Sequence, residues 1–130
     1  RVDRRQRQMC IRDREYRIPY SSWWPQELPD ERNFDEARAK LDSVGWKVDY
    51  VITHTCSTRM LSPTLYPAPG WNRPGVDRLT AFFDELEDRL DYKRWYYGHF
   101  HRDANPAERH TELYDRIVRP GDELRPWDVA

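Results

Sequence analysis

Three histidines have the residue type and the spacing of metal ligands. His99 and His101 are separated by one residue in the segment "YYGHFHRD", and His54 ends the apolar segment "VDYVITH". Neutral imidazole is a common nitrogen ligand for zinc, iron and nickel. Gly98 precedes the pair, and glycine removes a side chain where the backbone must bend or pass close to a ligand cluster. The pattern predicts a metal site in which the paired histidines bind either one ion together or two adjacent ions separately.

Four neighbouring residues have more than one interpretation. Cys56 is either an inert buried thiol, which we favour, or a thiolate within reach of a metal. Asp103 either accepts a hydrogen bond from a ligand imidazole or is solvated, and Arg102 is a candidate for binding a phosphate group. His110 is expected at the surface or at the entry to a strand, with metal ligation as the alternative.

The elements that must position these residues alternate between strands and helices. Asp30 is expected to cap a helix that runs to about Val44 and stops at Gly45, and a second helix is expected from about Val76 to Leu90. Strands are expected in "EYRIPY", "WKVDYVITH", "YKRWYYGHFH" and "HTELYDRIVRP", and a long loop is expected from Thr55 to Gly75. The acidic run "DELEDRLD" is interpreted as the solvated face of the second helix.

This order predicts an α/β fold, in which ligands gather at the ends of strands. His54 ends one expected strand, and His99 and His101 end the next. Neighbouring strands lie about 5 Å apart, so a returning helix can bring these imidazoles together. Trp23 and Trp24 occupy a proline-rich loop, where they pack beneath the loop or, alternatively, stack on a ring of a ligand.

Length and composition predict one globular domain. The chain has 130 residues and a net charge of -1. No apolar segment approaches the roughly 20 residues that span a bilayer, and the N-terminal residues lack the apolar core of a signal peptide. A cytoplasmic protein without a membrane partner is therefore expected. Cys10 and Cys56 fit no C-x-x-C spacing, so two unpaired thiols are expected instead of a disulfide scaffold or a zinc knuckle.

Residues 1–14 differ from the rest of the chain, because they carry six arginines against two aspartates. The segment "RRQRQMCIRDR" resembles the translation of sequencing-adapter DNA, so native sequence is expected to begin near Glu15. The alternative is a basic arm that contacts nucleic acid. Without such an arm, nucleic acid is expected as a substrate at most and not as a binding partner. The chain is accordingly divided into a non-native or disordered segment at 1–14, a folded part at 15–121 and a tail at 122–130.

The segments "VDYVITHTC" and "YYGHFHRD", separated by a helix ending "DELEDRLDYKRW", closely resemble the C-terminal half of the calcineurin-like metallophosphoesterases, particularly compact bacterial single-domain members. The resemblance covers residues 15–121. It implies an incomplete α/β (α+β) fold, the C-terminal half of a four-layer β-sandwich flanked by helices. It also implies that His54 and His99 bind one metal ion and His101 the other. The two divalent ions, which are manganese, iron, zinc or nickel, would hydrolyse phosphate mono- or diesters.

The chain departs from this family in one respect. The motifs D-x-H, G-D-x-x-D and G-N-H-[DE], which carry the other ligands and the catalytic histidine, do not occur in the sequence. The resemblance therefore implies that the missing N-terminal half of the same domain is a partner. We expect the chain alone to bind metal weakly or not at all and to lack phosphoesterase activity, because three imidazoles leave a dication short of compensating charge. The alternative is a stand-alone half-fold that binds a metal or a protein; substrate, metal identity and oligomeric state stay open.

Overall fold

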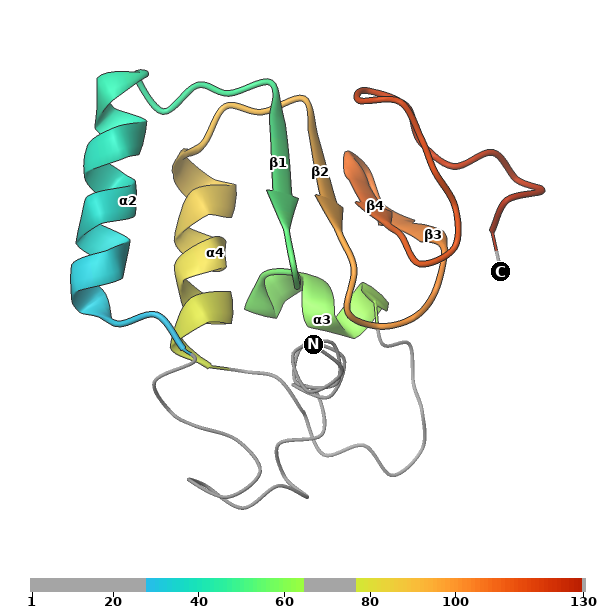
Figure 1. Ribbon diagram of the computed structural model, residues 1–130, viewed down its shortest axis with the longest axis horizontal. Coiled ribbons are helices and arrows are strands. Elements are labelled where there is room, and N and C mark those ends of the chain that lie inside the picture. The colour runs from blue at the N-terminus through green and yellow to red at the C-terminus, as the bar shows by residue number, and fades with distance from the viewer. Residues whose placement is uncertain (1–27, 65–76, 130) are drawn as a thin grey trace, which may run out of the picture.

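The computed structural model describes residues 28–64 and 77–129, with only the backbone of residues 62–64. One mixed sheet has the strand order β1-β2-β4-β3 (Figure 1). Its strands are β1 (Tyr50–Thr53), β2 (Arg94–Tyr97), β3 (Ala104–Ala107) and β4 (His110–Glu112). Strands β1, β2 and β4 are parallel, and β3 is antiparallel to β4. The expected mixed α/β class is confirmed, and the second sheet of the sandwich stays a prediction.

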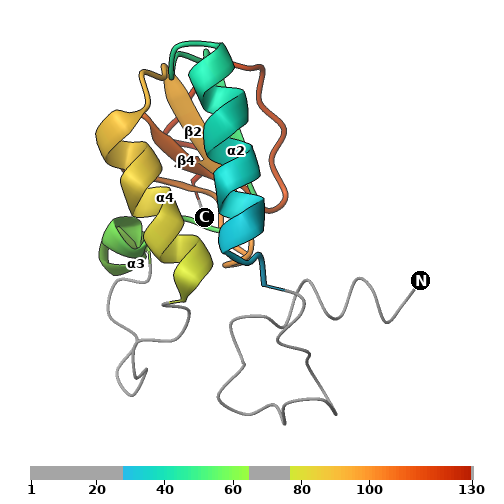
Figure 2. The ribbon, with the colours of Figure 1, turned by 90° about the vertical axis from the view of Figure 1, so that its left-hand side faces the viewer.

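Two long helices lie over one face of this sheet (Figure 2). They are α2 (Glu31–Ser43) and α4 (Arg78–Arg89), and both begin at an aspartate whose side chain accepts backbone N–H groups in a capping box. Gly45 follows α2 with φ of 66°, so the predicted stop is confirmed. Val44 forms the C-terminal cap of α2 and is 53 % exposed.

Aromatic side chains fill the space between the helices and the sheet. Phe34 of α2 stacks on Phe82 of α4 with ring centroids 4.6 Å apart. Trp95 and Tyr97 point from β2 into the same core. Tyr96 lies between them in sequence and points to the opposite face, where its hydroxyl accepts the Gly121 N–H at 2.7 Å and donates to the carbonyl of residue 122 at 2.8 Å. The sheet is therefore covered by helices on one face and by the C-terminal segment on the other.

The loop predicted from Thr55 to Gly75 is wrong over its first part, because helix α3 (Thr58–Thr64) forms there. Two tertiary contacts stabilise its first turn. The Asp84 carboxylate of α4 accepts the Arg59 N–H at 2.9 Å, and the side chains of Met60 and Leu61 are buried in the core. Neither contact could be predicted from the sequence of this proline-rich segment, because both depend on residues elsewhere in the fold. The remainder of that predicted loop, residues 65–75, lies outside the described residues.

The prediction for the last strand is also partly wrong. A strand was expected throughout "HTELYDRIVRP", but β4 ends at Glu112. The Leu113 N–H still donates to the Tyr97 carbonyl, and the N–H groups after it leave the ladder because the Asp103 carboxylate accepts those of Tyr114, Asp115 and Arg116. The edge strand β3 is not among the predicted strands; it contains Pro106 and pairs irregularly with β4.

The remaining expectations fall on segments that the structure does not describe. The strand predicted in residues 15–20, the segment 1–14, Cys10, Trp23 and Trp24 all lie outside the described residues. Within the described ranges, none of the helices has both the length and the apolar character required to cross a bilayer.

Candidate functional site

The three parallel strands end at one edge of the sheet, and the histidines lie at that edge. His54 follows β1, and its carbonyl accepts the Gly98 N–H at 3.1 Å. On the other side of β2, the Leu113 N–H donates to the Tyr97 carbonyl at 2.9 Å. The segments that leave β1, β2 and β4 are thus in direct contact, as expected for the carboxyl ends of parallel strands.

The structure brings His54 and His99 together, as the sequence predicts. Their ring centroids are 4.9 Å apart at an interplanar angle of 61°. The His54 side chain is exposed, whereas His99 is 8 % exposed and also packs against Phe100 at 4.8 Å. One imidazole therefore faces solvent while the other is held among aromatic rings.

Both members of the H-x-H pair have a left-handed backbone. The φ angle is 77° at His99 and 55° at His101. Such angles are uncommon for residues other than glycine and persist only where the surrounding structure holds them. Glycine would adopt both conformations at lower cost, so the histidine side chains are present in spite of a conformational penalty.

His101 has a different neighbour from the other two histidines. Its ring stacks on Tyr114, which follows β4, with centroids 4.8 Å apart and an angle of 19° between the planes. The Tyr114 side chain is 53 % exposed, so the stacked pair lies at the surface.

Asp103 holds backbone instead of an imidazole. Its carboxylate is 3 % exposed and accepts the N–H groups of residues 114, 115 and 116 at 2.8–3.2 Å. Burial acts to raise its pKa, but these hydrogen bonds keep the pKa of Asp103 below its usual value. The prediction of a solvated Asp103 is wrong, and among the described residues its hydrogen bonds go to main-chain groups and not to a histidine.

Arg102 pairs with a buried carboxylate on β4. Its Nη2 lies 3.1 Å from Glu112 Oε2, and the Glu112 side chain is fully buried. Burial raises the pKa of Glu112 to about 7 in spite of this cation. The other oxygen, Oε1, has no hydrogen-bond partner among the residues described. Phosphate binding by Arg102 stays a prediction, and in this structure that binding would compete with the Glu112 ion pair.

Cys56 is 1 % exposed and belongs to the hydrophobic core. This position agrees with the favoured interpretation of a buried thiol. It follows His54 by two residues, at the point where the chain turns from β1 towards α3.

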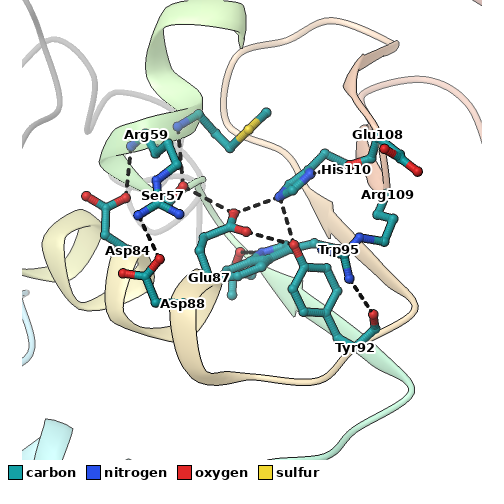
Figure 3. Close-up of polar contacts among 12 residues, drawn as sticks. Ser57, Arg59, Asp84, Glu87, Asp88, Tyr92, Trp95, Glu108, Arg109 and His110 are labelled. Carbon is teal, nitrogen blue, oxygen red and sulfur yellow. Dashed lines mark hydrogen bonds and ion pairs between the residues drawn. The ribbon is translucent and has the colours of Figure 1, made fainter.

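Sequence reasoning missed a second polar cluster, which lies between α4, the residue before α3 and the start of β4 (Figure 3). Glu87 Oε1 lies 2.7 Å from His110 Nε2, and Glu87 Oε2 accepts the Tyr92 hydroxyl at 2.7 Å. The Ser57 hydroxyl donates to the same carboxylate at 3.3 Å. Burial acts to raise the pKa of Glu87, but the hydrogen bonds from His110 and Tyr92 hold that pKa below its usual value.

His110 opens β4, as one interpretation of the sequence predicts, but it is buried and not at the surface. Its Nδ1 lies 2.8 Å from the Glu108 carbonyl, so both ring nitrogens face oxygen atoms of glutamate residues. Glu87 likewise departs from the predicted solvated face. Its position at i+7 from Thr80 and i+4 from Phe83, both buried, is the signal that places it beside the core.

Only part of the predicted ligand set comes together in the described residues. Structural zinc takes four ligands, and here two imidazoles lie side by side while a third is on the following turn. Within the described residues, no group of three or more histidine, cysteine, aspartate or glutamate side chains is arranged to hold an ion. The paired rings of His54 and His99 therefore fit two nitrogen ligands of such a site, and its other ligands would have to come from elsewhere.

Compared with models of protein families, with curated proteins and with solved structures, the chain has no significant match.

Proposed function

We propose that this chain contributes the imidazole ligands of a dinuclear metal centre that hydrolyses phosphate mono- or diesters. The observation that carries the proposal is the pair of histidine rings, 4.9 Å apart, at the ends of adjacent parallel strands. The left-handed backbone at His99 and His101 supports it, because strained conformations of this kind are concentrated at functional sites.

The proposed roles follow the positions of the three rings. His54 and His99 hold one ion, and His101 holds the second from the following turn. When bound, such ions polarise the phosphoryl oxygens and lower the pKa of a bound water. The buried position of His99 fixes one ligand in direction, while the exposed His54 ring approaches from the solvent side.

The proposal includes a partner segment that carries carboxylates. Two dications beside three neutral imidazoles need compensating negative charge, and Glu112 and Asp103 are already committed to Arg102 and to backbone N–H groups. We infer that the missing carboxylate ligands come from the N-terminal half of a four-layer sandwich, of which this sheet is one part. The chain alone is then a weak metal binder and an inactive phosphoesterase.

A zinc titration of the 130-residue chain, followed by NMR of the histidine ring signals, tests the site. Zinc is expected to shift the signals of His54, His99 and His101. His110 is the internal control, because Glu87 and the Glu108 carbonyl engage both of its nitrogens. If zinc in excess shifts none of the three signals, or shifts all four alike, the proposed ligands are wrong.

An activity measurement tests the division of the site between two segments. The chain alone is expected to hydrolyse bis(p-nitrophenyl) phosphate no faster than a variant carrying both His54→Ala and His101→Ala. A rate about tenfold above that of the double variant, equivalent to about 1.4 kcal/mol of barrier, would show that this chain carries a complete active site.

A second candidate function is a stand-alone module that binds a protein partner. It is favoured by the apolar side chain of Ile52, which is 77 % exposed on β1. Sedimentation of the chain with and without Ile52→Thr separates the two candidates. Self-association that this substitution abolishes favours the module, and a monomer in both samples favours the metal centre.

A further inference from the structure

The segment after β4 is held by a single buried carboxylate. Asp103 Oδ1 accepts the N–H groups of Tyr114 at 2.8 Å, Asp115 at 3.2 Å and Arg116 at 3.1 Å. Asp103 Oδ2 also accepts the Asp115 N–H, at 3.2 Å. Hydrogen bonds to an ionised acceptor are stronger than those between neutral groups. Three consecutive residues are thereby fixed against the turn that carries the H-x-H pair.

The fixed segment places an aromatic ring on His101. The Tyr114 and His101 rings are nearly parallel, with centroids 4.8 Å apart, although Tyr114 is about half exposed. An exposed side chain ordinarily exchanges among rotamers, and ordering it costs conformational entropy. Here the backbone of Tyr114 is immobilised by Asp103, so only the tyrosine's own side-chain torsions need to be ordered for the stack to form.

His101 needs such a support more than its neighbours do. Its side chain is exposed, unlike that of His99, and its backbone has the uncommon φ of 55°. A metal ligand that samples many rotamers loses affinity, because binding must then order it.

We propose that Asp103 and Tyr114 are positioning residues for His101, with Asp103 fixing the Tyr114 backbone and the Tyr114 ring fixing the imidazole. The role in metal binding rests on the proposed function, whereas the positioning itself belongs to the metal-free chain. Asp103 therefore acts on the His101 imidazole through the segment 114–116, without a bond to the imidazole itself.

NMR of the metal-free 130-residue chain tests the positioning. In the unsubstituted chain, the His101 ring protons are expected to be displaced upfield by the Tyr114 ring. Tyr114→Ala should abolish that displacement, and Asp103→Asn should reduce it. Tyr114→Phe and Asp115→Asn are the matched controls, since the first keeps a ring and the second changes an exposed carboxylate whose backbone alone is bound, and both should keep the displacement.

Two results would overturn the proposal. One is a His101 signal that does not move in Tyr114→Ala, and the other is an equal response to Asp103→Asn and Asp115→Asn. The His54 and His99 signals and the backbone spectrum report whether each variant is folded. If Asp103→Asn does not fold, Tyr114→Ala decides alone, because it removes only a surface ring.

Zinc titration of the same samples separates this proposal from the proposed function. The zinc affinity measured at His101 should fall about tenfold in Tyr114→Ala and stay unchanged in Tyr114→Phe. Equal affinities in the alanine and phenylalanine variants would remove the role in metal binding. If zinc moves no histidine in any sample, the proposed function fails while the metal-free result still decides the positioning.

Discussion

The backbone at His99 and His101 gives a measure of what these side chains cost the fold. A left-handed conformation is unfavourable by roughly 1–2 kcal/mol for a residue with a β-carbon and is free of this penalty for glycine. A turn selected only for stability would contain glycine at these positions. We interpret His99 and His101 as residues that carry a backbone penalty which glycine would not.

Substitution by glycine and by alanine tests this interpretation at His101. Both variants lose the imidazole, so their difference isolates the backbone. His101→Gly is expected to be more stable than His101→Ala by about 1 kcal/mol in urea unfolding. At His54, where φ is not positive, His54→Ala should instead be more stable than His54→Gly, by about 0.5–1 kcal/mol. The same order at both positions would contradict a conformational penalty at His101.

Glu112 gives the folded state a dependence on pH. Its pKa is raised to about 7 by burial, above the usual value near 4.5, so the folded chain binds this proton more tightly than the unfolded chain does. Below pH 4.5 the group is protonated in both states and costs nothing. As pH rises from 4.5 to 7 the free energy of unfolding falls, by about 3 kcal/mol in total.

Glu112→Gln is therefore expected to leave stability at pH 4.5 almost unchanged and to raise it at pH 8 by about 2–3 kcal/mol. Chemical denaturation at the two pH values measures the difference. A carboxylate exposed on the surface, such as Asp115, provides the control, since Asp115→Asn should change stability by less than about 0.5 kcal/mol at either pH. An equal effect of Glu112→Gln at both pH values would show that the raised pKa is wrong.

At the residue level, the sequence predicts those contacts that follow from the order of strands and helices along the chain. The contact between His54 and His99 follows from two strand ends joined by a helical crossover. The roles of Asp103 and Glu87 do not follow, because their partners are backbone N–H groups and a histidine that only the tertiary fold brings close. An acidic residue in a loop or on a helix has the same local signature whether it is solvated or buried.

Among the elements, the helices were predictable and the short pieces were not. Helices α2 and α4 combine an aspartate cap with a regular apolar stripe, and both signals are local. Helix α3 and strand β3 are set by contacts with distant residues, such as that between Asp84 and the Arg59 N–H. Tertiary contacts outweigh local preference where an element is only a few residues long.

The cluster around Glu87 joins three elements and is expected to contribute most to their packing. It contacts Ser57 before α3, Tyr92 after α4 and His110 in β4. Glu87→Gln should lower the free energy of unfolding by about 2 kcal/mol, because a neutral amide replaces the ionised acceptor of the buried hydrogen bonds to His110 and Tyr92.

Asp88→Asn, on the next residue of α4, is the control for this substitution. The Asp88 carboxylate pairs with Arg59 at 3.0 Å, but both side chains are more than half exposed. The expected loss is therefore below about 1 kcal/mol. Equal losses for the two variants, measured by urea unfolding, would contradict a special role for the buried cluster.

At the scale of the whole molecule, the sheet is enclosed from two sides by different means. The helices cover one face with aromatic side chains, and the C-terminal segment covers the other through hydrogen bonds to Tyr96 and Asn105. The sequence indicated the first layer through its helical stripes. It contained no comparable signal for the second, which was predicted to be partly strand and partly tail.

Tyr96→Phe tests how the second layer is attached. The variant keeps the ring and removes the hydroxyl that accepts the Gly121 N–H. A loss of about 1 kcal/mol in stability is expected, with faster hydrogen exchange at the Gly121 amide. Tyr114→Phe, which also removes a tyrosine hydroxyl, should leave that amide unaffected. Unchanged exchange in Tyr96→Phe would mean that other contacts hold the segment.

The Asp103 clamp also has a consequence for the order of events during protein synthesis. Its N–H donors follow it by 11 to 13 residues, so they leave the ribosome after the histidines do. Until Arg116 has emerged, the nascent chain carries His54, His99 and His101 without the contacts that fix the last of them. The turn that carries the H-x-H pair can therefore reach its final packing only after translation has passed the last strand of the sheet.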